Sequence, residues 1–266
     1  MITKLVEKTQ KAITKRIEAD PGNDKYKIYT VDKKTADPNV QIHEPQKTVG
    51  KYNVFRIQAL KDFTCNGRSV KAGEFGGFIA GYDNLAAAGD CWVFDNAVVS
   101  GKALVSGDAC IQGDAIVEGY RTEVSGTSVI KDRARVYTGQ IVDSDVEDDV
   151  VIAAICKESD LSNGNNDNGY MKAILNNRNT LERIGKGSPI IQDSIISGTS
   201  KILGPAFVDD STVQDNAVVY GGTEKNSFVE SDAIILGAYL SSCTVGKDSI
   251  VTKSYRGETL EEFVDM

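Results

Sequence analysis

The amino-acid sequence predicts an all-β fold: a parallel β-helix with an N-terminal α-helix, a small β cap and one excursion made of a loop and a helix. Three observations between residues 93 and 119 support this prediction. Large aliphatic residues recur at every sixth position: Val93, Val99, Val105, Ile111 and Val117. Alanines keep the same spacing: Ala97, Ala103, Ala109 and Ala115. Glycines keep it too: Gly101, Gly107, Gly113 and Gly119.

A six-residue period fits neither a regular helix nor a simple hairpin. An α-helix repeats every 3.6 residues, so a strict six-residue register would drift around its surface. Val, Ile and Gly are also poor helix residues. Six residues do accommodate one short strand and one corner, and three such units close a coil that stacks on the next. The aliphatic residue then fills the core, alanine fits a crowded corner, and glycine adopts a backbone conformation closed to other residues.

This repeat resembles the left-handed β-helix, or hexapeptide-repeat, superfamily. The segment from Gly76 to Ala109 is also similar to uncharacterised hexapeptide-repeat proteins of phages and bacteria; it reads GGFIAGYDNLAAAGDCWVFDNAVVSGKALVSGDA. The resemblance implies a left-handed coil and a homotrimer in which prism faces pack side by side. Many members of the superfamily are acyltransferases that use a histidine on the coil as general base. The resemblance therefore implies that an acyltransferase of this kind would have a histidine within the coils.

Residues 1–20 form the predicted N-terminal amphipathic helix. The helical stretch covers residues 3–19, with Thr3 as the N-cap and Asp20-Pro21 at its end. Apolar side chains share one face, and basic residues surround them. Two interpretations stay open: the helix packs on its own domain, or it self-associates or anchors the protein to a partner. The second makes four residues candidate partner or oligomer contacts: Leu5, Val6, Ile13 and Ile17.

Residues 21–90 are predicted to form a connector and a β-rich cap. Strands are expected at residues 26–31 and 52–60, and Asn66-Gly67 predicts a hairpin turn. A polar connector with the single histidine, His43, separates the two strands. Turn chemistry is our interpretation of three glycines: Gly73, Gly76 and Gly77. Such a cap would cover the open end of the coil, whose first turn otherwise exposes strand edges and core.

Two stacks of coils follow the cap. The first is expected at 91–155, with Trp92 packed at the cap–coil boundary and a one-residue slip of register near Tyr120. The second is expected at 190–256, and in both the predicted coil is three six-residue units long. Residues 257–266 would make one closing helical turn or a free acidic tail. The pattern leaves open whether the stacks form one prism or meet at a kink.

Residues 156–189 interrupt the repeat. They begin with a polar, Gly- and Asn-rich run and continue with apolar residues at near-helical spacing. We predict a loop and a short helix outside the stack, where this architecture commonly places function. Three residues here are further candidate partner or oligomer contacts: Tyr170, Met171 and Leu175.

Charge and cysteine content restrict the possible partners and compartment. A net charge of −8 and a pI near 4.9 disfavour binding to duplex DNA or to an anionic membrane. The five cysteines are dispersed without a CxxC pair, which indicates reduced thiols and assembly in a cytoplasm. Cys110 lies inside the repeat, so we interpret it as a small core residue. The sequence has no apolar signal segment at its N-terminus and no apolar run long enough to span a membrane.

The residues that acyl transfer or metal chemistry needs do not occur in the predicted coils. They contain no histidine, and His43 lies before them in the connector, where we interpret it as an ordinary loop residue. A zinc site built from several histidines is excluded because the chain has one. One acidic run could bind a divalent cation through its carboxylate oxygens, or it could simply form a solvated outer face, and we prefer the second interpretation. The run consists of Asp143, Asp145, Glu147, Asp148 and Asp149. The sequence therefore predicts no catalytic residue, no cofactor and no metal site.

We expect a non-enzymatic structural or interaction protein that uses a rigid β-helix as a spacer or display element. The phage-like segment favours a virion component, such as a head- or tail-associated fibre or decoration protein, assembled in the bacterial cytoplasm. The expected partners are further copies in a homotrimer and a particle component or host protein, and neither nucleic acid nor membrane. Two alternatives are a hexapeptide-repeat acyl- or nucleotide-sugar transferase and a phage-encoded inhibitor of a host defence system.

Overall fold

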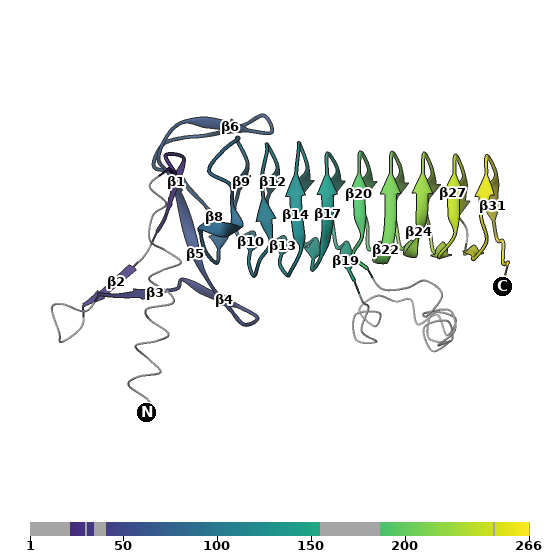
Figure 1. Ribbon diagram of the computed structural model, residues 1–266, viewed down its shortest axis with the longest axis horizontal. Coiled ribbons are helices and arrows are strands. Elements are labelled where there is room, and N and C mark those ends of the chain that lie inside the picture. The colour runs from purple at the N-terminus through teal and green to yellow at the C-terminus, as the bar shows by residue number, and fades with distance from the viewer. Residues whose placement is uncertain (1–21, 30, 35–40, 155–186, 247, 266) are drawn as a thin grey trace, which may run out of the picture.

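The computed structural model describes residues 22–29, 31–34, 41–154, 187–246 and 248–265 (Figure 1). Over these residues the chain forms a parallel β-solenoid of about nine turns, with an antiparallel cap at its N-terminal end. The all-β prediction is confirmed at this level. Within the described ranges the only helix is a short 3-10 helix, η1 (Tyr82–Asn84).

One face of the solenoid is a parallel sheet of nine short strands. Each strand pairs with the equivalent strand of the next coil, so the sheet runs the length of the solenoid. In order along the axis its strands are β9 (Trp92–Val93), β12 (Cys110–Ile111), β15 (Val129–Ile130), β18 (Asp145–Val146), β21 (Ile195–Ile196), β23 (Thr212–Val213), β25 (Phe228–Val229), β28 (Thr244–Gly246) and β31 (Thr259–Glu261).

The other two faces belong to one larger sheet, because two long strands, β22 (Lys201–Asp209) and β24 (Val218–Lys225), turn the corner between them. The second face also contains β8 (Phe75–Ile79), β10 (Val98–Val99), β13 (Ile116–Val117), β16 (Arg135–Val136), β19 (Val151–Ala153), β26 (Ile234–Leu236) and β29 (Ile250–Val251). The third contains β11 (Leu104–Val105), β14 (Thr122–Ser125), β17 (Gly139–Val142), β20 (Ile190–Gln192), β27 (Tyr239–Ser241) and β30 (Tyr255–Arg256).

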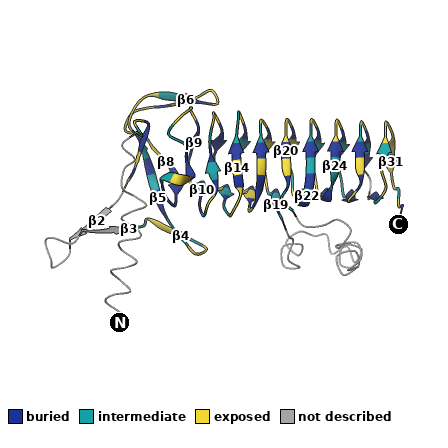
Figure 2. Ribbon diagram, viewed as in Figure 1, coloured by how far each residue is buried: buried dark blue, intermediate teal, exposed yellow. Residues whose placement is uncertain are grey.

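The interior is a column of aliphatic side chains, one from each short strand. Successive residues of a strand point to opposite sides, so a two-residue strand places one side chain inside. The predicted inward residues Val93, Val99, Val105, Ile111 and Val117 are all fully buried, which confirms the six-residue pattern. Figure 2 shows this alternation of buried and exposed residues around each coil.

Coil length follows corner length. In the first coils Val98 pairs with Ile116, which is the predicted spacing of three six-residue units, but in the later coils Val218 already pairs with Ile234. The corner between β11 and β12 spans 106–109, whereas the equivalent corner between β17 and β18 holds only Asp143-Ser144. The prediction of one constant coil length is therefore wrong for the later coils, because a shorter corner replaces a longer one.

The two predicted stacks are one continuous solenoid. Strand β17 pairs in parallel with β20, β18 with β21 and β19 with β22, so residues on either side of the excursion share one register. The excursion leaves the stack after β19 and returns at β20, at a corner between two faces (Figure 1). The register passes through this point without a break.

The cap joins the solenoid through β8. Strands β1 (Tyr26–Ile28) and β4 (Lys47–Val49) pair antiparallel with β5 (Tyr52–Ala59), which pairs antiparallel with β8. Strand β8 then pairs in parallel with β10 of the first coil. The predicted hairpin turn at Asn66-Gly67 is confirmed between β6 (Phe63–Cys65) and β7 (Arg68–Val70). The cap strand predicted at 52–60 is confirmed at 52–59, whereas the strand predicted at 26–31 ends at Ile28 and Val31 begins β2.

Two expectations about the cap are wrong. Residues 32–50 do not form a plain connector, because β2 (Val31–Lys34) and β3 (Gln41–Glu44) pair antiparallel and place His43 in a strand opposite Asp32. Gly76 and Gly77 are strand residues of β8 and not turn residues. A Cβ on Gly77 would lie 2.6 Å from the Ala97 carbonyl oxygen, so glycine is needed there for close packing of β8 on the first coil.

The C-terminal residues close the last coil. Strand β31 pairs with β28, and Val264 bridges to Ile250. Asp265 is buried and accepts hydrogen bonds from the backbone nitrogens of Thr252 at 2.6 Å and Lys253 at 3.1 Å. The expectation of a helical turn or a free tail at 257–266 is therefore wrong, because this segment continues the register of the solenoid.

The expected N-terminal helix, with Leu5, Val6, Ile13 and Ile17, lies outside the described residues. So do Tyr170, Met171 and Leu175 of the excursion. In the part of the chain that the structure describes, no helix is long and apolar enough to cross a membrane.

Candidate functional site

The outer face of the nine-stranded sheet is partly covered by the β6–β7 hairpin. The first residue of each short strand points outward here, because the second points into the core. Trp92 and Cys110 occupy this outer column, yet both are buried. Cys65 of the hairpin contacts Cys110, and the Phe63 ring packs edge-on against Trp92 at a centroid distance of 5.2 Å. The expectation that Trp92 packs at the cap–coil boundary is confirmed.

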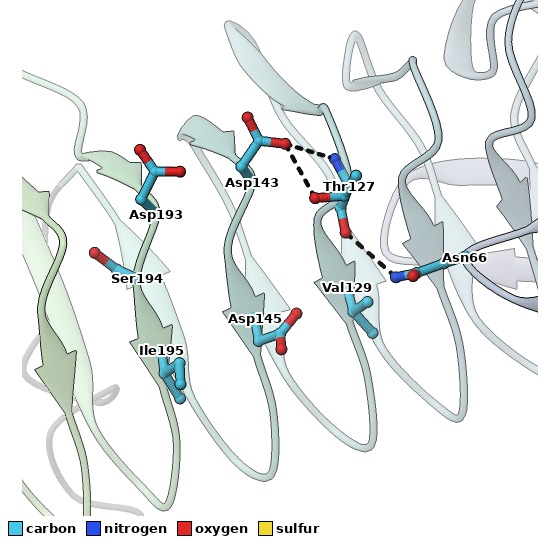
Figure 3. A pocket seen from close by; sticks show the side chains of 8 residues that line it. All are labelled: Asn66, Thr127, Val129, Asp143, Asp145, Asp193, Ser194 and Ile195. Atoms are coloured by element: carbon cyan, nitrogen blue, oxygen red, sulfur yellow. Dashed lines mark hydrogen bonds between the residues drawn. The ribbon is translucent and has the colours of Figure 1, made fainter.

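A shallow groove begins where the hairpin ends (Figure 3). Asn66, at the hairpin tip, donates a hydrogen bond from Nδ2 to the Thr127 carbonyl oxygen at 3.3 Å. Beyond this contact the outer column continues with Val129, Asp145 and Ile195. The groove has a volume of about 410 Å³ and is lined by Asn66, Thr127, Val129, Asp143, Asp145, Asp193, Ser194 and Ile195.

The three aspartates of the groove play different structural roles. Asp143 occupies the corner before β18 at a positive φ of 48°, and its Oδ1 accepts hydrogen bonds from Thr127 N at 2.8 Å and Thr127 Oγ1 at 3.1 Å (Figure 3). Asp193 holds the equivalent corner before β21 at a φ of 47°. Asp145 stands in the outer column of β18. Two of the three carboxylates are therefore positioned by corner geometry.

Two further acidic residues of the predicted cluster are paired with basic residues of the preceding coil. Glu147 forms an ion pair with Lys131. Asp149 accepts a hydrogen bond from Arg133 Nε at 2.6 Å, and this guanidinium lowers the pKa of the Asp149 carboxyl. These pairs stand on the exposed surface, which agrees with the preferred interpretation of a solvated face.

The residues of the acidic run do not converge on a single point. Asp148 accepts a hydrogen bond from the Gly198 backbone nitrogen at 3.0 Å, and Asp143 lies in a corner and not in a strand. Residues 143, 145 and 147 therefore do not share one strand face, as a cation site built from this run would require. Within the described ranges, no group of three His, Cys, Asp or Glu side chains is arranged to hold a metal ion.

Serines form a continuous hydrogen-bonded ladder along the corner beside the groove. At its centre, Ser211 Oγ donates to the Asp209 carbonyl oxygen at 2.8 Å and accepts from the Ser227 backbone nitrogen at 3.0 Å. The same pattern links buried residues of successive coils: Ser128, Ser144, Ser194, Ser211, Ser227 and Cys243. From Ser128 to Cys243, each coil is thereby joined to the next by a side-chain bond as well as by its strands.

Aspartates form a second ladder at the neighbouring corner. Asp215, for example, accepts a hydrogen bond from the Ser231 backbone nitrogen of the next coil at 3.1 Å. Aspartate tolerates a positive φ because its short side chain bonds locally. Among the described residues, eight aspartates have a positive φ: Asp95, Asp132, Asp143, Asp148, Asp193, Asp210, Asp215 and Asp248. These eight acidic residues therefore have a structural reason to occur, and their charge does not by itself indicate a basic partner.

A second groove lies farther along the same corner. It has a volume of about 390 Å³ and is lined by Asp210, Thr212, Asn226, Ser227, Phe228, Ser242, Cys243 and Thr244. These are the register equivalents of the residues around the first groove. The two grooves are thus the same surface feature, repeated in different coils along one corner. They differ because the β6–β7 hairpin borders the first groove and not the second.

A lysine is buried at the cap–coil boundary. Lys25 is 1% exposed, and its Nζ donates hydrogen bonds to the carbonyl oxygens of Gly89 at 3.1 Å and Cys91 at 3.2 Å, and to Cys91 Sγ at 3.3 Å. Burial raises the pKa of the Cys91 thiol although the Lys25 ammonium opposes this effect. These bonds join the start of β1 to the first coil.

Glu224 lies in the hydrophobic interior. It is the inward residue of β24, in register with Val208 of the preceding coil and Leu240 of the following one. The side chain is fully buried, and neither carboxyl oxygen has a hydrogen-bond partner in the described part of the chain. Burial raises the pKa of this carboxyl well above its usual range. Strand β24 bends at Gly221-Gly222, both at positive φ, and beyond this bend Thr223 is partly exposed while Glu224 is buried.

Sequence reasoning missed the corner chemistry, although a signal was present. The dipeptide Asp-Ser recurs at 143–144, 193–194 and 210–211, each time directly before a strand of the same sheet.

No known protein family and no curated protein matches this chain in sequence.

Proposed function

We propose that this protein is a non-enzymatic structural or interaction protein whose solenoid serves as a rigid spacer or display element. The observation that carries this proposal is the unbroken register from β8 to β31, which continues across the excursion. Nine strands at a spacing of about 4.8 Å give a column roughly 40 Å long. A solenoid whose interior is packed in this way is rigid, so it holds its two ends at a fixed distance from each other.

The ladders at the corners support the same proposal. In stacked-repeat proteins each unit contacts only its neighbours, so stiffness depends on the interface between adjacent units. Here that interface includes backbone hydrogen bonds on three faces, the serine ladder and the aspartate ladder. Bending between coils would have to break several of these bonds at once.

The more specific form of the proposal is a left-handed β-helix of the hexapeptide-repeat type that assembles as a homotrimer in the bacterial cytoplasm and joins a phage particle. The six-residue repeat and the segment from Gly76 to Ala109 support it. In this proposal residues 1–20 anchor the protein to the particle or to the trimer axis, and the solenoid projects.

The spacer proposal is tested by removing one coil. Deletion of residues 228–243 joins Ser227 to Thr244, which repeats the native junction because Phe228 and Thr244 are register partners. We expect a folded protein whose maximum dimension in small-angle X-ray scattering falls by about 4.8 Å. The matched control deletes residues 228–235 and breaks the register, so it should not fold. Loss of folding in both variants would refute a modular rod.

The particle proposal is tested by co-sedimentation. Density-gradient fractions of phage particles from the producing cells should contain the full chain, and a chain that begins at Gly22 should be lost from them. Light scattering should give about 86 kDa, three times 28.7 kDa, for the purified protein. A protein found only in unassembled fractions, or one that binds coenzyme A or a nucleotide sugar saturably, would overturn the proposal.

A further inference from the structure

The β6–β7 hairpin is held on the solenoid by side chains only. Its two strands pair with each other and form a separate two-stranded sheet. Arg68 makes an ion pair with Asp95 at 3.3 Å and stacks over the Phe94 ring at 4.0 Å. Together with Phe63 on Trp92 and Asn66 on Thr127, these contacts fix the hairpin above the first coils. No strand pairing has to break for the hairpin to lift away.

Two thiols meet beneath this hairpin. Cys65 of β6 is fully buried, Cys110 of β12 is 3% exposed, and their sulfur atoms are 3.3 Å apart. A disulfide bond has an S–S length of about 2.05 Å, so closure needs a shift of roughly 1.3 Å. Both cysteines are free. The expectation that Cys110 is a small core residue is confirmed, because it is buried in the main hydrophobic core, on the side of β12 that faces the hairpin.

We propose that Cys65 and Cys110 form a reversible disulfide that locks the hairpin onto the solenoid, with a low-molecular-weight disulfide such as glutathione disulfide as the oxidant. The bond would join positions 45 residues apart in sequence and convert a contact of side chains into a covalent link. It would also fix Asn66 at the end of the groove.

The reaction is a thiol–disulfide exchange in two steps. The hairpin lifts, and the Cys110 thiolate attacks one sulfur of glutathione disulfide, which forms a mixed disulfide and releases one glutathione thiolate. Cys65, once deprotonated, attacks the Cys110 sulfur of the mixed disulfide and releases the second glutathione. Two protein thiols are oxidised, one glutathione disulfide is reduced to two glutathione molecules, and the two protons pass to the released thiolates.

In the closed state the two thiols are unequal, and Cys110, which stays in place on the solenoid when the hairpin lifts, is taken as the attacking group. The Cys65 thiol donates its hydrogen bond to Cys110 Sγ, which lowers the pKa of Cys110, and the same bond together with burial raises the pKa of Cys65. Cys91 is engaged with Lys25 and with the carbonyl oxygens of Ala86 and Val105. Of the four described cysteines, Cys65 and Cys110 are the pair in direct sulfur–sulfur contact.

The test uses the full chain in a glutathione redox buffer without denaturant. Peptide mapping by mass spectrometry without reductant should find one cross-link, between the peptides of Cys65 and Cys110, with the loss of two hydrogens. Reduction should reverse it. The variant Cys65→Ser should lose the cross-link, and the matched control Cys243→Ser, at a buried thiol far along the solenoid, should keep it.

Hydrogen exchange measures how strongly the disulfide restricts opening of the hairpin. Amides of residues 63–70 should exchange about 10²–10³ times more slowly in the oxidised protein, the equilibrium factor expected for closing a loop of this length. Equal exchange in the two states would overturn the proposal. So would a cross-link that forms only in denaturant, or one that joins Cys65 or Cys110 to Cys91 or Cys156. The map on the unmodified chain decides the matter even if a serine variant fails to fold.

Discussion

Replacing Glu224 by leucine is expected to stabilise the protein. Leucine continues the aliphatic column between Val208 and Leu240, whereas glutamate places a carboxyl there with no partner among the described residues. A buried polar group without a hydrogen bond costs about 1–3 kcal/mol in protein mutational data. The change of side-chain shape offsets part of that gain, by less than about 1.5 kcal/mol. At pH 5 we therefore expect Glu224→Leu to unfold with a free energy about 1–2 kcal/mol higher than the native sequence.

The advantage of leucine should grow as the pH rises. The pKa of Glu224 is raised by burial above its ordinary value of 4.5, so above pH 4.5 the folded state retains a proton that the unfolded chain releases. The native protein then loses stability as the pH increases toward the folded-state pKa, by about 1.4 kcal/mol for each pH unit. A non-titrating residue at this position removes that loss.

Urea denaturation at several pH values between 5 and 8 measures both effects. The matched variant Glu224→Gln should abolish the pH-dependent loss and gain less than leucine, because its amide stays buried without a partner. A leucine variant less stable than the native protein at pH 7 would refute the reasoning. A stability difference that does not change with pH would also refute it, since it would mean that the carboxyl is solvated or paired.

Three further predictions concern the corners and the two ends. Asp265→Asn should lower the unfolding free energy at pH 7 by about 1–2 kcal/mol, because the asparagine loses the charged hydrogen-bond acceptor. Burial raises the pKa of the Asp265 carboxyl, but its hydrogen bonds outweigh this effect and lower the pKa below 3.8. The stability that the carboxylate contributes is therefore present above pH 3.8 and is lost as the pH falls through the folded-state pKa. Ser211→Ala should cost about 1–3 kcal/mol because it leaves the Ser227 backbone nitrogen without its hydrogen-bond acceptor in a buried position. Gly77→Ala should cost about 1–3 kcal/mol because its Cβ would lie 2.6 Å from a backbone oxygen.

Each has its own measurement and control. For Asp265, thermal melts of variant and native protein should converge toward pH 3, and a gap that stays constant would contradict the carboxylate role. For Ser211, the control is Ser197→Ala, a half-buried serine whose side chain makes no hydrogen bond within the described ranges, and equal urea midpoints for the two would contradict the ladder. For Gly77, hydrogen exchange should rise in β5 and β8, and an unchanged cap would contradict close packing.

The contacts between side chains at the candidate site could not be predicted from the sequence. The acidic run suggested converging carboxylates, but Asp143 stands in a two-residue corner and Glu147 pairs with Lys131 of the preceding coil. Neither fact is visible in a linear pattern, because the length of each corner decides which residues fall in a strand and which fall in the corner. The Cys65–Cys110 contact and the buried Lys25 were equally invisible, since their partners lie 45 and 66 residues away.

The sequence by itself determined the solenoid and the inward residues of its first coils. A six-residue period is local information: one strand, one corner and one inward side chain repeat within a few bonds of each other, so Val93, Val99 and Val105 could be placed in the core without any knowledge of their neighbours. The Asn66-Gly67 turn was local in the same way.

Only the tertiary structure decided how the coils meet. The continuity of the solenoid depends on pairing across the excursion, where Gln140 and Ile190 become partners although the whole excursion lies between them in sequence. The burial of Glu224 depends on the bend at Gly221-Gly222, and the closure of the last coil depends on Asp265 reaching back to Thr252. These features follow from register between coils, which is fixed by hydrogen bonds between distant segments and not by the residues next to them in sequence.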